Sequence, residues 1–365
     1  METPSPPTPT VATTPAAARA TLVRLYEKSI RRFYLPGAAL FAGSNSYDGR
    51  VWKVSEGSAA NTPSVQLALR QLQLRGMKPP LDPAPIAQRW IAEQLPSAEY
   101  GDIAWMLWAE ALGGVPNVAP LFDALRRRLP WRPSATMELS WVLSALCHAH
   151  AAATRSQPDA GASTGPEPDA VEKTARRVRD RLCGNHCGAS GLFYPSSRRH
   201  GWLRRRRPEV SISSVSYAIH ALALFGRTFD CGDSIEIAKR CADLLCRLQG
   251  PEGQWWWKYR VATGELAAEY PIYAVNQDGA MLLALEELER ALGDHRYRDA
   301  IDRGILWLFQ AREAGAPLVD EEQGVVWRGI EREGSAFRLM REMRSYHSGR
   351  SLYAHLAGEG EAPGA

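Results

Sequence analysis

The sequence has no long apolar run: none of its stretches approaches the roughly 18 consecutive apolar residues that a transmembrane helix needs. Cysteine is sparse, with six in 365 residues, and in a long chain for which we expect no secretory leader this indicates reduced thiols. Excess charge is small too, because a formal net charge of +4 does not by itself imply a nucleic-acid partner. We therefore expect a soluble, cytoplasmic protein that binds no nucleic acid.

Three segments are poor in apolar residues. Residues 1–16 are rich in Pro, Thr and Ala and lack the basic start and apolar core of a targeting signal, so we expect a disordered tail there. Residues 153–168 are rich in Ala, Ser, Gly and Pro and indicate a disordered insertion. Because this insertion falls between two helical hairpins, we predict one domain over residues 17–358, followed by a second disordered tail at 359–365.

Helical periodicity recurs along the rest of the chain in two alternating kinds. One kind is amphipathic with a charged face, which is typical of an outer ring, and occupies residues 19–33, 86–95, 117–128, 169–182, 234–248 and 297–312. The other kind is apolar, small or aromatic on most sides, and its stretches begin near Ser64, Tyr100, Thr136, Ser213, Gln277 and Tyr346. The alternation predicts an all-α, (α/α)6 toroid with short β-hairpins in the long connections 251–272 and 313–335. The N-termini of the inner helices would meet at one mouth, where a ligand binds.

One heptapeptide, Gln249 to Trp255, reads Q-x3-G-x-W and lies between two helices. Its glutamine can satisfy backbone groups at the helix end, its glycine permits a tight turn, and its tryptophan can cover the gap between hairpins. A degenerate copy, Cys187-x3-Gly191-x-Phe193, occurs one hairpin earlier. These turns resemble the Gln-Trp repeats of the terpenoid cyclase and protein prenyltransferase superfamily, as in the β-domain of squalene–hopene cyclases.

The resemblance implies an isoprenoid-binding enzyme of the cyclase or prenyltransferase kind. The D-x-D-D-T-A acid motif of squalene–hopene-type cyclases is similar to the stretch Asn276-Gln277-Asp278-Gly279-Ala280, which keeps the final Asp as Asp278. Gln277 stands at the protonating position and is not an acid. Tyr346-His347 resembles the His-bearing inner helix of the zinc prenyltransferases, but no Asp-x-Cys precedes it. The resemblance therefore assigns the role of acid, or of cation-stabilising carboxylate, to Asp278.

The catalytic candidates are polar residues that open inner helices: Asp278, His347, Asp102 and Glu138. Asp102 and Glu138 are 36 residues apart, a repeat spacing, and with Asp278 they would line one mouth as acid and base. Each carboxylate can equally be interpreted as a helix cap. His347, beside Tyr346 and Arg350, can shuttle protons, bind an anion or be structural.

The substrate-binding candidates are aromatic, amide and basic side chains near this mouth. Aromatic faces stabilise carbocations and also stack on sugar rings, and arginines bind diphosphate or acidic sugars. The set comprises Trp255, Trp256, Trp257, Tyr270, Tyr273, Gln277, Tyr346, Arg350, Arg204 and Arg205.

Three functions are consistent with the pattern. The first is the isoprenoid-binding enzyme, with isomerase chemistry; the second is a carbohydrate-active toroid, a glycoside hydrolase or uronic-acid epimerase that uses Asp102, Glu138 and Asp278; the third is a non-catalytic binding toroid. We expect no cofactor, although Mg or Zn stays open, since Cys183-x3-Cys187 with His186 has a spacing that zinc tolerates. We expect the partner to be a small isoprenoid or sugar. Peripheral contact with a membrane and the oligomeric state both stay open.

Overall fold

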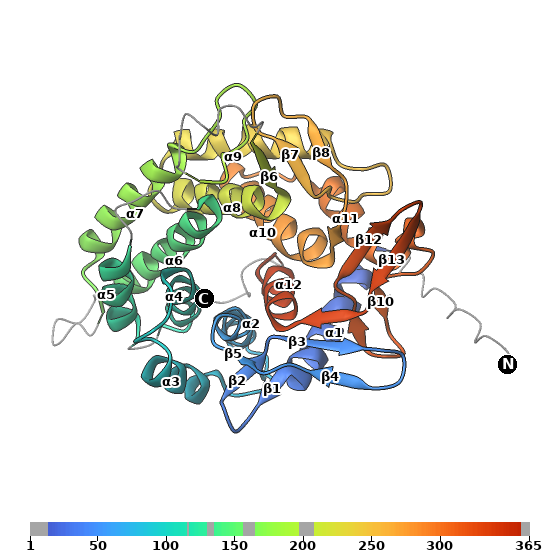
Figure 1. Ribbon diagram of the computed structural model, residues 1–365. Coiled ribbons are helices and arrows are strands. Elements are labelled where there is room, and N and C mark those ends of the chain that lie inside the picture. The colour runs from blue at the N-terminus through green and yellow to red at the C-terminus, as the bar shows by residue number, and fades with distance from the viewer. Residues whose placement is uncertain (1–13, 115–116, 130–134, 156–164, 197–207, 359–365) are drawn as a thin grey trace, which may run out of the picture.

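The computed structural model describes residues 14–114, 117–129, 135–155, 165–196 and 208–358 (Figure 1). Within them, helices alternate between an outer and an inner ring. The outer helices are α1 (Pro15–Phe33), α3 (Pro83–Glu93), α5 (Val118–Arg128), α7 (Pro168–Cys183), α9 (Gly232–Arg247) and α11 (Arg298–Gln310). The inner helices are α2 (Thr62–Leu74), α4 (Tyr100–Leu112), α6 (Thr136–Arg155), α8 (Ile212–Thr228), α10 (Met281–Leu292) and α12 (Ser345–Gly358). Each inner helix packs against the next, and α12 returns to α2, which confirms the predicted toroid.

The two kinds of helix differ in how much of their surface is buried, as their composition predicts. Helix α9 buries a single stripe that includes Ala238, Cys241 and Leu245, spaced three and four residues apart. Helix α8 is buried on nearly all sides from Val215 to Gly226. One neighbouring element is enough to cover a narrow apolar stripe, whereas a helix that is apolar on all sides needs neighbours on every side. The pattern therefore determines which helix lies inside the ring.

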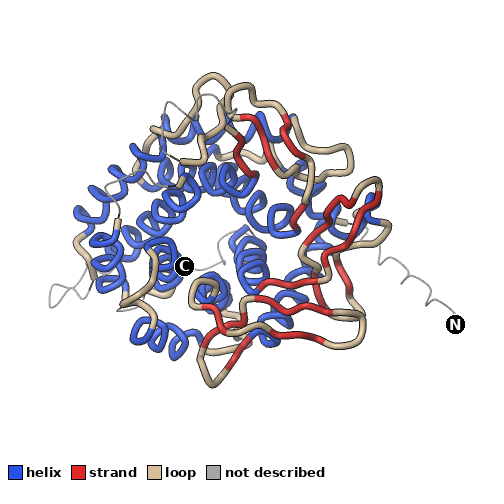
Figure 2. The backbone as a smooth tube through the Cα atoms, viewed as in Figure 1, coloured by secondary structure: helices blue, strands red, loops and turns tan. Residues whose placement is uncertain are grey.

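Short β-strands occupy the long connections, and Figure 2 shows them gathered along one side of the ring. The predicted hairpins are present as β7 (Lys258–Arg260) with β8 (Leu266–Ala268) and β10 (Val319–Asp320) with β11 (Val325–Val326). A third hairpin pairs β12 (Gly329–Glu333) with β13 (Ala336–Met340), which lies beyond the predicted connection. Strand β6 (Glu209–Ser211) pairs with β7, and β9 (Ile272–Tyr273) pairs with β12.

A further set of strands, between α1 and α2, was not expected from the sequence. It consists of β1 (Tyr34–Leu35), β2 (Leu40–Ala42), β3 (Ser44–Tyr47), β4 (Trp52–Val54) and β5 (Gly57–Ser58). Strand β3 pairs with β14 (Glu342–Arg344), which directly precedes α12. This pairing joins the two ends of the ring through backbone hydrogen bonds.

The Gln249 turn performs the packing role that its sequence predicts. The Gln249 Nε2 donates to the carbonyl oxygens of Gly253, at 2.7 Å, and of Ala300, at 2.8 Å. Gly253 has a φ of +101°, and a Cβ there would lie 2.4 Å from the Arg303 carbonyl oxygen. Only glycine allows that approach. The Trp255 side chain is 1% exposed, so the turn fastens α9 to α11.

The predicted segment boundaries fall close to helix ends. Helix α1 begins at Pro15, inside the segment expected to be a tail, and α6 continues to Arg155, inside the expected insertion. Residues 1–13, 156–164 and 359–365, which carry the rest of the predicted disorder, lie outside the described residues. No helix in the described ranges is both long and apolar enough to span a bilayer.

Candidate functional site

The first turns of α4 and α6 bring two carboxylates to the same end of the ring, which we call the mouth. Asp102 lies in the first turn of α4 and Glu138 in that of α6. Gly101 makes this approach close, because a Cβ there would lie 3.4 Å from the Trp141 ring and 3.9 Å from the Glu138 Cγ. Both carboxylate side chains are half-buried, so they are reachable from solvent and partly desolvated.

The pKa of Asp102 is raised to about 6. Burial is the largest cause, and the negative charges of Glu99 and Glu138 raise the pKa further, while Arg350 lowers it. A carboxyl group in this range exchanges its proton near neutral pH, as general acid–base catalysis requires. Asp102 can therefore hold or release a proton under mild conditions.

Glu138 is held in place by a neighbouring phenol. The hydroxyl of Tyr100, the first residue of α4, donates a hydrogen bond to Glu138 Oε2. A hydrogen bond from an outside donor restricts the rotamer of a carboxylate and leaves its other oxygen available. Glu138 is thus oriented by the same helix that carries Asp102.

Arg350, from α12, is packed among aromatic rings at the mouth. Its guanidinium carbon lies 4.5 Å from the ring centre of Trp105, 5.1 Å from those of Trp141 and Tyr346, and 5.5 Å from that of Tyr217. Its Nη1 donates to the Tyr217 hydroxyl at 3.2 Å. Cation–π contacts of this kind fix the guanidinium plane.

Three N–H donors of this aromatic cluster have no acceptor among the described residues: Arg350 Nε, Trp105 Nε1 and Trp141 Nε1. Buried donors are nearly always paired in folded proteins, but the core residues Trp108 and Trp255 also have an unpaired Nε1 among the described residues, so what sets these three donors apart is their position at the mouth. Unpaired donors beside half-buried carboxylates are typical of a site that binds a polar ligand.

A second set of aromatic and charged side chains lies on the connections next to the mouth. Trp257 packs edge-on against Tyr273 with ring centres 5.1 Å apart. The Arg328 guanidinium lies 4.9 Å from the Tyr273 ring centre and pairs with Glu342 at 2.6 Å. Arg328 is also near Tyr346, so these side chains continue the surface of the mouth.

Asp278 lies instead in a sealed cluster between α1, α12 and the π-helical turn η2 (Asn276–Ala280). It is 0% exposed. Its carboxylate accepts hydrogen bonds from Tyr26 Oη at 2.6 Å and Ser351 Oγ at 3.0 Å, and its Oδ2 lies 3.4 Å from His355 Nε2. Burial raises the pKa of Asp278, but the hydrogen bond and charge of His355, with His347 and Tyr26, outweigh burial and leave the pKa lowered.

His347 belongs to the same sealed cluster rather than to the mouth. Its Nε2 lies 3.1 Å from Tyr26 Oη and 3.9 Å from Asp278 Oδ1, and the residue is 2% exposed. Burial lowers the pKa of His347 to about 4, although Asp278 opposes that shift. The histidine is therefore neutral near pH 7. The structure thus separates the four catalytic candidates into two pairs.

Some of the remaining substrate-binding candidates lie in the core, and others are half-buried at the surface. Trp255 is core, and Gln277 pairs with its backbone, accepting from the N–H at 2.8 Å and donating to the carbonyl at 3.2 Å. Trp256 is half-buried and lies edge-on to Tyr270, with ring centres 6.1 Å apart. Arg204 and Arg205 lie outside the described residues.

Metal-ligating side chains do not gather in the described part of the chain, where no three His, Cys, Asp or Glu residues could hold an ion together. In the Cys183-x3-Cys187 segment, His186 packs on Phe193 with ring centres 5.3 Å apart. Burial raises the pKa of the Cys183 thiol to about 11, whereas burial is outweighed at Cys187 by hydrogen bonds that lower the pKa of its thiol.

Tyr100 and Tyr217 were not expected from the sequence to be site residues, and Trp105 and Trp141 were not in the expected binding set. A signal for the two tryptophans exists, because Asp102-x-x-Trp105 and Glu138-x-x-Trp141 share one acid-x-x-Trp spacing. Residues three apart lie on one helix face, so a tryptophan follows each carboxylate into the ring.

The comparisons with known proteins identify the fold. No family model and no curated protein matches the chain. Solved structures do match. A sugar epimerase from a ruminal bacterium has a TM-score of 0.66 at 10% identity, covering 94% of this chain and 99% of that one. An inactive variant of an α-1,6-mannanase from Salegentibacter, bound to mannotetrose, has a TM-score of 0.63 at 10% identity, covering 93% and 98%. The unsaturated glucuronyl hydrolase of Bacillus sp. GL1 has a TM-score of 0.61 at 13% identity, covering 94% and 97%.

These findings correct two expectations. The resemblance to terpenoid cyclases and protein prenyltransferases was wrong, because the matching toroids include an α-1,6-mannanase, unsaturated glucuronyl hydrolases, a D-mannose isomerase and a sugar epimerase. An isoprenoid-binding cyclase or prenyltransferase, the main function expected from that resemblance, was therefore wrong as well. The physical reason is that a Gln-Gly-Trp turn fastens neighbouring helical hairpins, which any toroid needs, and carries no chemistry.

Proposed function

We propose that this chain is a carbohydrate-active enzyme, a glycoside hydrolase, whose acid–base pair is Asp102 and Glu138. The observation that carries the proposal is the pairing of a half-buried carboxyl of pKa about 6 with a second, oriented carboxylate at the mouth. A glycosidase needs one carboxyl group that is protonated when the substrate binds and a second that is ionised. The matching toroids, which are named for sugar substrates, support the same class.

In this reaction the protonated Asp102 donates its proton to the glycosidic oxygen, and the bond from that oxygen to the anomeric carbon breaks. The Glu138 carboxylate takes a proton from the attacking water, so that one water is added across the bond. Tyr100 keeps Glu138 aimed by its hydrogen bond. The half-buried faces of Trp141 and Tyr346 supply stacking surface for the sugar ring.

The test is turnover of an oligosaccharide panel, comprising α-1,6-manno-oligosaccharides and oligosaccharides with an unsaturated glucuronyl end, followed by mass spectrometry. We expect the full chain to release shorter products that have gained one water, and Asp102→Asn and Glu138→Gln each to lose roughly 10²–10⁴-fold in kcat. The matched control is Asp123→Asn, on the exposed face of the outer helix α5. Binding without turnover would indicate a non-catalytic toroid, and a product of unchanged mass would indicate epimerisation; either outcome overturns the hydrolase proposal.

A further inference from the structure

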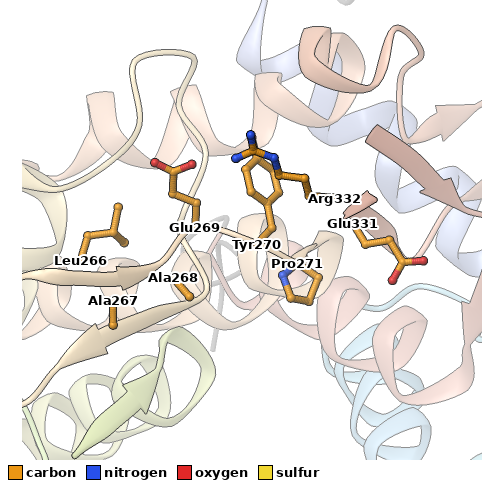
Figure 3. Close-up of a pocket in the computed structure, with 8 residues that line it drawn as sticks. All are labelled: Leu266, Ala267, Ala268, Glu269, Tyr270, Pro271, Glu331 and Arg332. Atoms are coloured by element: carbon orange, nitrogen blue, oxygen red, sulfur yellow. The ribbon is translucent and has the colours of Figure 1, made fainter. Parts of the chain in front are cut away.

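A groove of about 590 Å³ lies between two β-hairpins, outside the mouth (Figure 3). One wall is β8, the edge strand of the β6–β7–β8 sheet, with the segment that follows it, and the other wall is β12. The groove is lined by Ala267, Ala268, Glu269, Tyr270, Glu331 and Arg332, among others. None of these residues takes part in the acid–base chemistry proposed above.

Tyr270 gives the groove a rigid aromatic surface. Its ring lies edge-on to Trp256, with ring centres 6.1 Å apart, and tilted against Phe337, at 5.0 Å. Two aromatic neighbours restrict its rotamers, while the side chain stays half-buried. Figure 3 shows the Tyr270 ring beside the Arg332 side chain. A fixed, partly exposed phenol ring is a platform on which a sugar ring stacks.

The charged residues of the groove favour a neutral sugar. Glu269 is exposed, and Glu331 is half-buried and paired with Arg338. Arg332 is exposed and donates from its Nε to the Gly334 carbonyl at 3.3 Å. Because the charge of Glu331 is offset by its partner and that of Glu269 by Arg332, the groove has no excess of either sign that would attract a uronate or sulfate group. Its carboxylates can accept hydrogen bonds from the hydroxyls of an uncharged hexose.

The groove and the mouth are connected through adjacent residues. Trp256 contacts Tyr270 in the groove, and its neighbour Trp257 contacts Tyr273. Tyr273 in turn lies under Arg328, which is near Tyr346 at the mouth. Aromatic side chains therefore line both the groove and the surface next to the mouth, and the consecutive residues Trp256 and Trp257 contribute one to each.

We infer that the groove between β8 and β12 is a second carbohydrate-binding site. It holds neutral hexose units of a glycan at a distance from the end that enters the mouth. The inference rests on the proposed function, because the glycan in the groove is the one whose end enters the mouth. Its chemistry is stacking on Tyr270 and hydroxyl recognition by Glu269 and Glu331, with no covalent step.

The experiment is native affinity electrophoresis of the full chain through gels that contain α-1,6-mannan, dextran or konjac glucomannan, with heparin as the charged polymer. We expect at least one neutral polymer to retard the chain and heparin to do so less. Tyr270→Ala should weaken retardation about tenfold, the size expected for a lost stacking contact. Tyr34→Ala is the matched control, since Tyr34 is half-buried and packs on Phe41 at 5.4 Å in a different sheet. It should leave retardation unchanged.

Asp102→Asn separates this inference from the proposed function. It should abolish turnover and keep full retardation, because Asp102 does not line the groove. Retardation by no neutral polymer, or unchanged retardation of Tyr270→Ala, would overturn the groove inference and leave the hydrolase test untouched. Loss of retardation in Asp102→Asn would place the polymer in the mouth alone and would overturn the inference as well.

Discussion

Asp102 and Asp278 each lie in the first turn of a helical segment that lines the ring, yet their surroundings and the directions of their pKa shifts are opposite. Asp102 is half-buried, and its pKa is raised to about 6; Asp278 is completely buried, and its pKa is lowered. Burial alone would give the more buried carboxylate the higher pKa. The partners reverse that order, because Tyr26, Ser351 and His355 surround Asp278.

The comparison separates a group built for stability from one suited to chemistry. A carboxylate whose oxygens are all engaged by buried partners has no capacity left for a substrate. A carboxylate near other negative charges, with its pKa close to neutrality, can exchange a proton. The sealed cluster around Asp278 is therefore expected to contribute to folding and the mouth to function.

The largest expected effect is on stability at Asp278. Asp278→Ala leaves Tyr26, Ser351 and His355 buried without their acceptor, which should lower the free energy of unfolding by about 3–5 kcal/mol. Asp102→Ala, the matched change at the mouth, should lower it by less than about 1 kcal/mol. Urea unfolding followed by circular dichroism measures both. Equal losses at the two sites would contradict the division.

The second effect is a pH dependence of stability that arises from His347. Its pKa is lowered to about 4 in the folded chain, against about 6.5 unfolded. The unfolded state therefore binds the proton first: stability is complete above pH 6.5 and falls as the pH drops from 6.5 to 4. Because each pH unit costs about 1.4 kcal/mol, His347 should account for about 3 kcal/mol over that window.

His347→Gln should flatten this part of the profile, measured as urea unfolding at pH 7.0 and 4.5. Other buried histidines act in the same direction and leave a residual slope, because burial lowers the pKa of His148 to about 3 and that of His220 as well. Exposed His295, whose side chain is 81% exposed, is the control position, and His295→Gln should leave the slope unchanged. An unchanged slope in His347→Gln would rule out the buried, neutral histidine.

Most of the ring could be predicted from sequence because its signals are local. The 3.6-residue period of the 234–248 stretch already identifies α9 as an outer helix, and the apolar surround of Tyr217 identifies α8 as an inner one. The strands between α1 and α2 could not be predicted. They are two to four residues long, and β3 finds its partner β14 almost 300 positions later, at Met343 opposite Asn45.

The candidate site was predictable in part, for the same reason. The repeat spacing of Asp102 and Glu138 placed both at inner-helix starts, which the structure brings together. The complete burial of Asp278 could not be predicted from the sequence, because its closest partner, Tyr26, is 252 residues away on α1. Nothing in the segment 276–280 distinguishes a satisfied carboxylate from an available one, because that difference is made by distant side chains.

The smallest expected effect concerns the tuning of Asp102 by Glu99, an exposed residue at the start of α4. The negative charge of Glu99 raises the pKa of Asp102. If Asp102 must be protonated to act as the acid, kcat/KM falls as the pH rises through about 6, and Glu99→Gln should move that fall to lower pH by a fraction of a unit. Because salt screens exposed charges, the displacement should shrink as ionic strength rises from 0.05 to 1 M.

The measurement is the pH profile of kcat/KM at both salt concentrations, with Glu93→Gln as the control, since Glu93 is an exposed carboxylate of the outer helix α3 that pairs with Arg89. A rise of kcat/KM through about pH 6, in place of a fall, would mean that the ionised form of Asp102 is the active one; Glu99→Gln would then move that rise to lower pH, because removing a neighbouring negative charge favours ionisation. The carboxyl would then be the base of the pair, and Glu138 the acid.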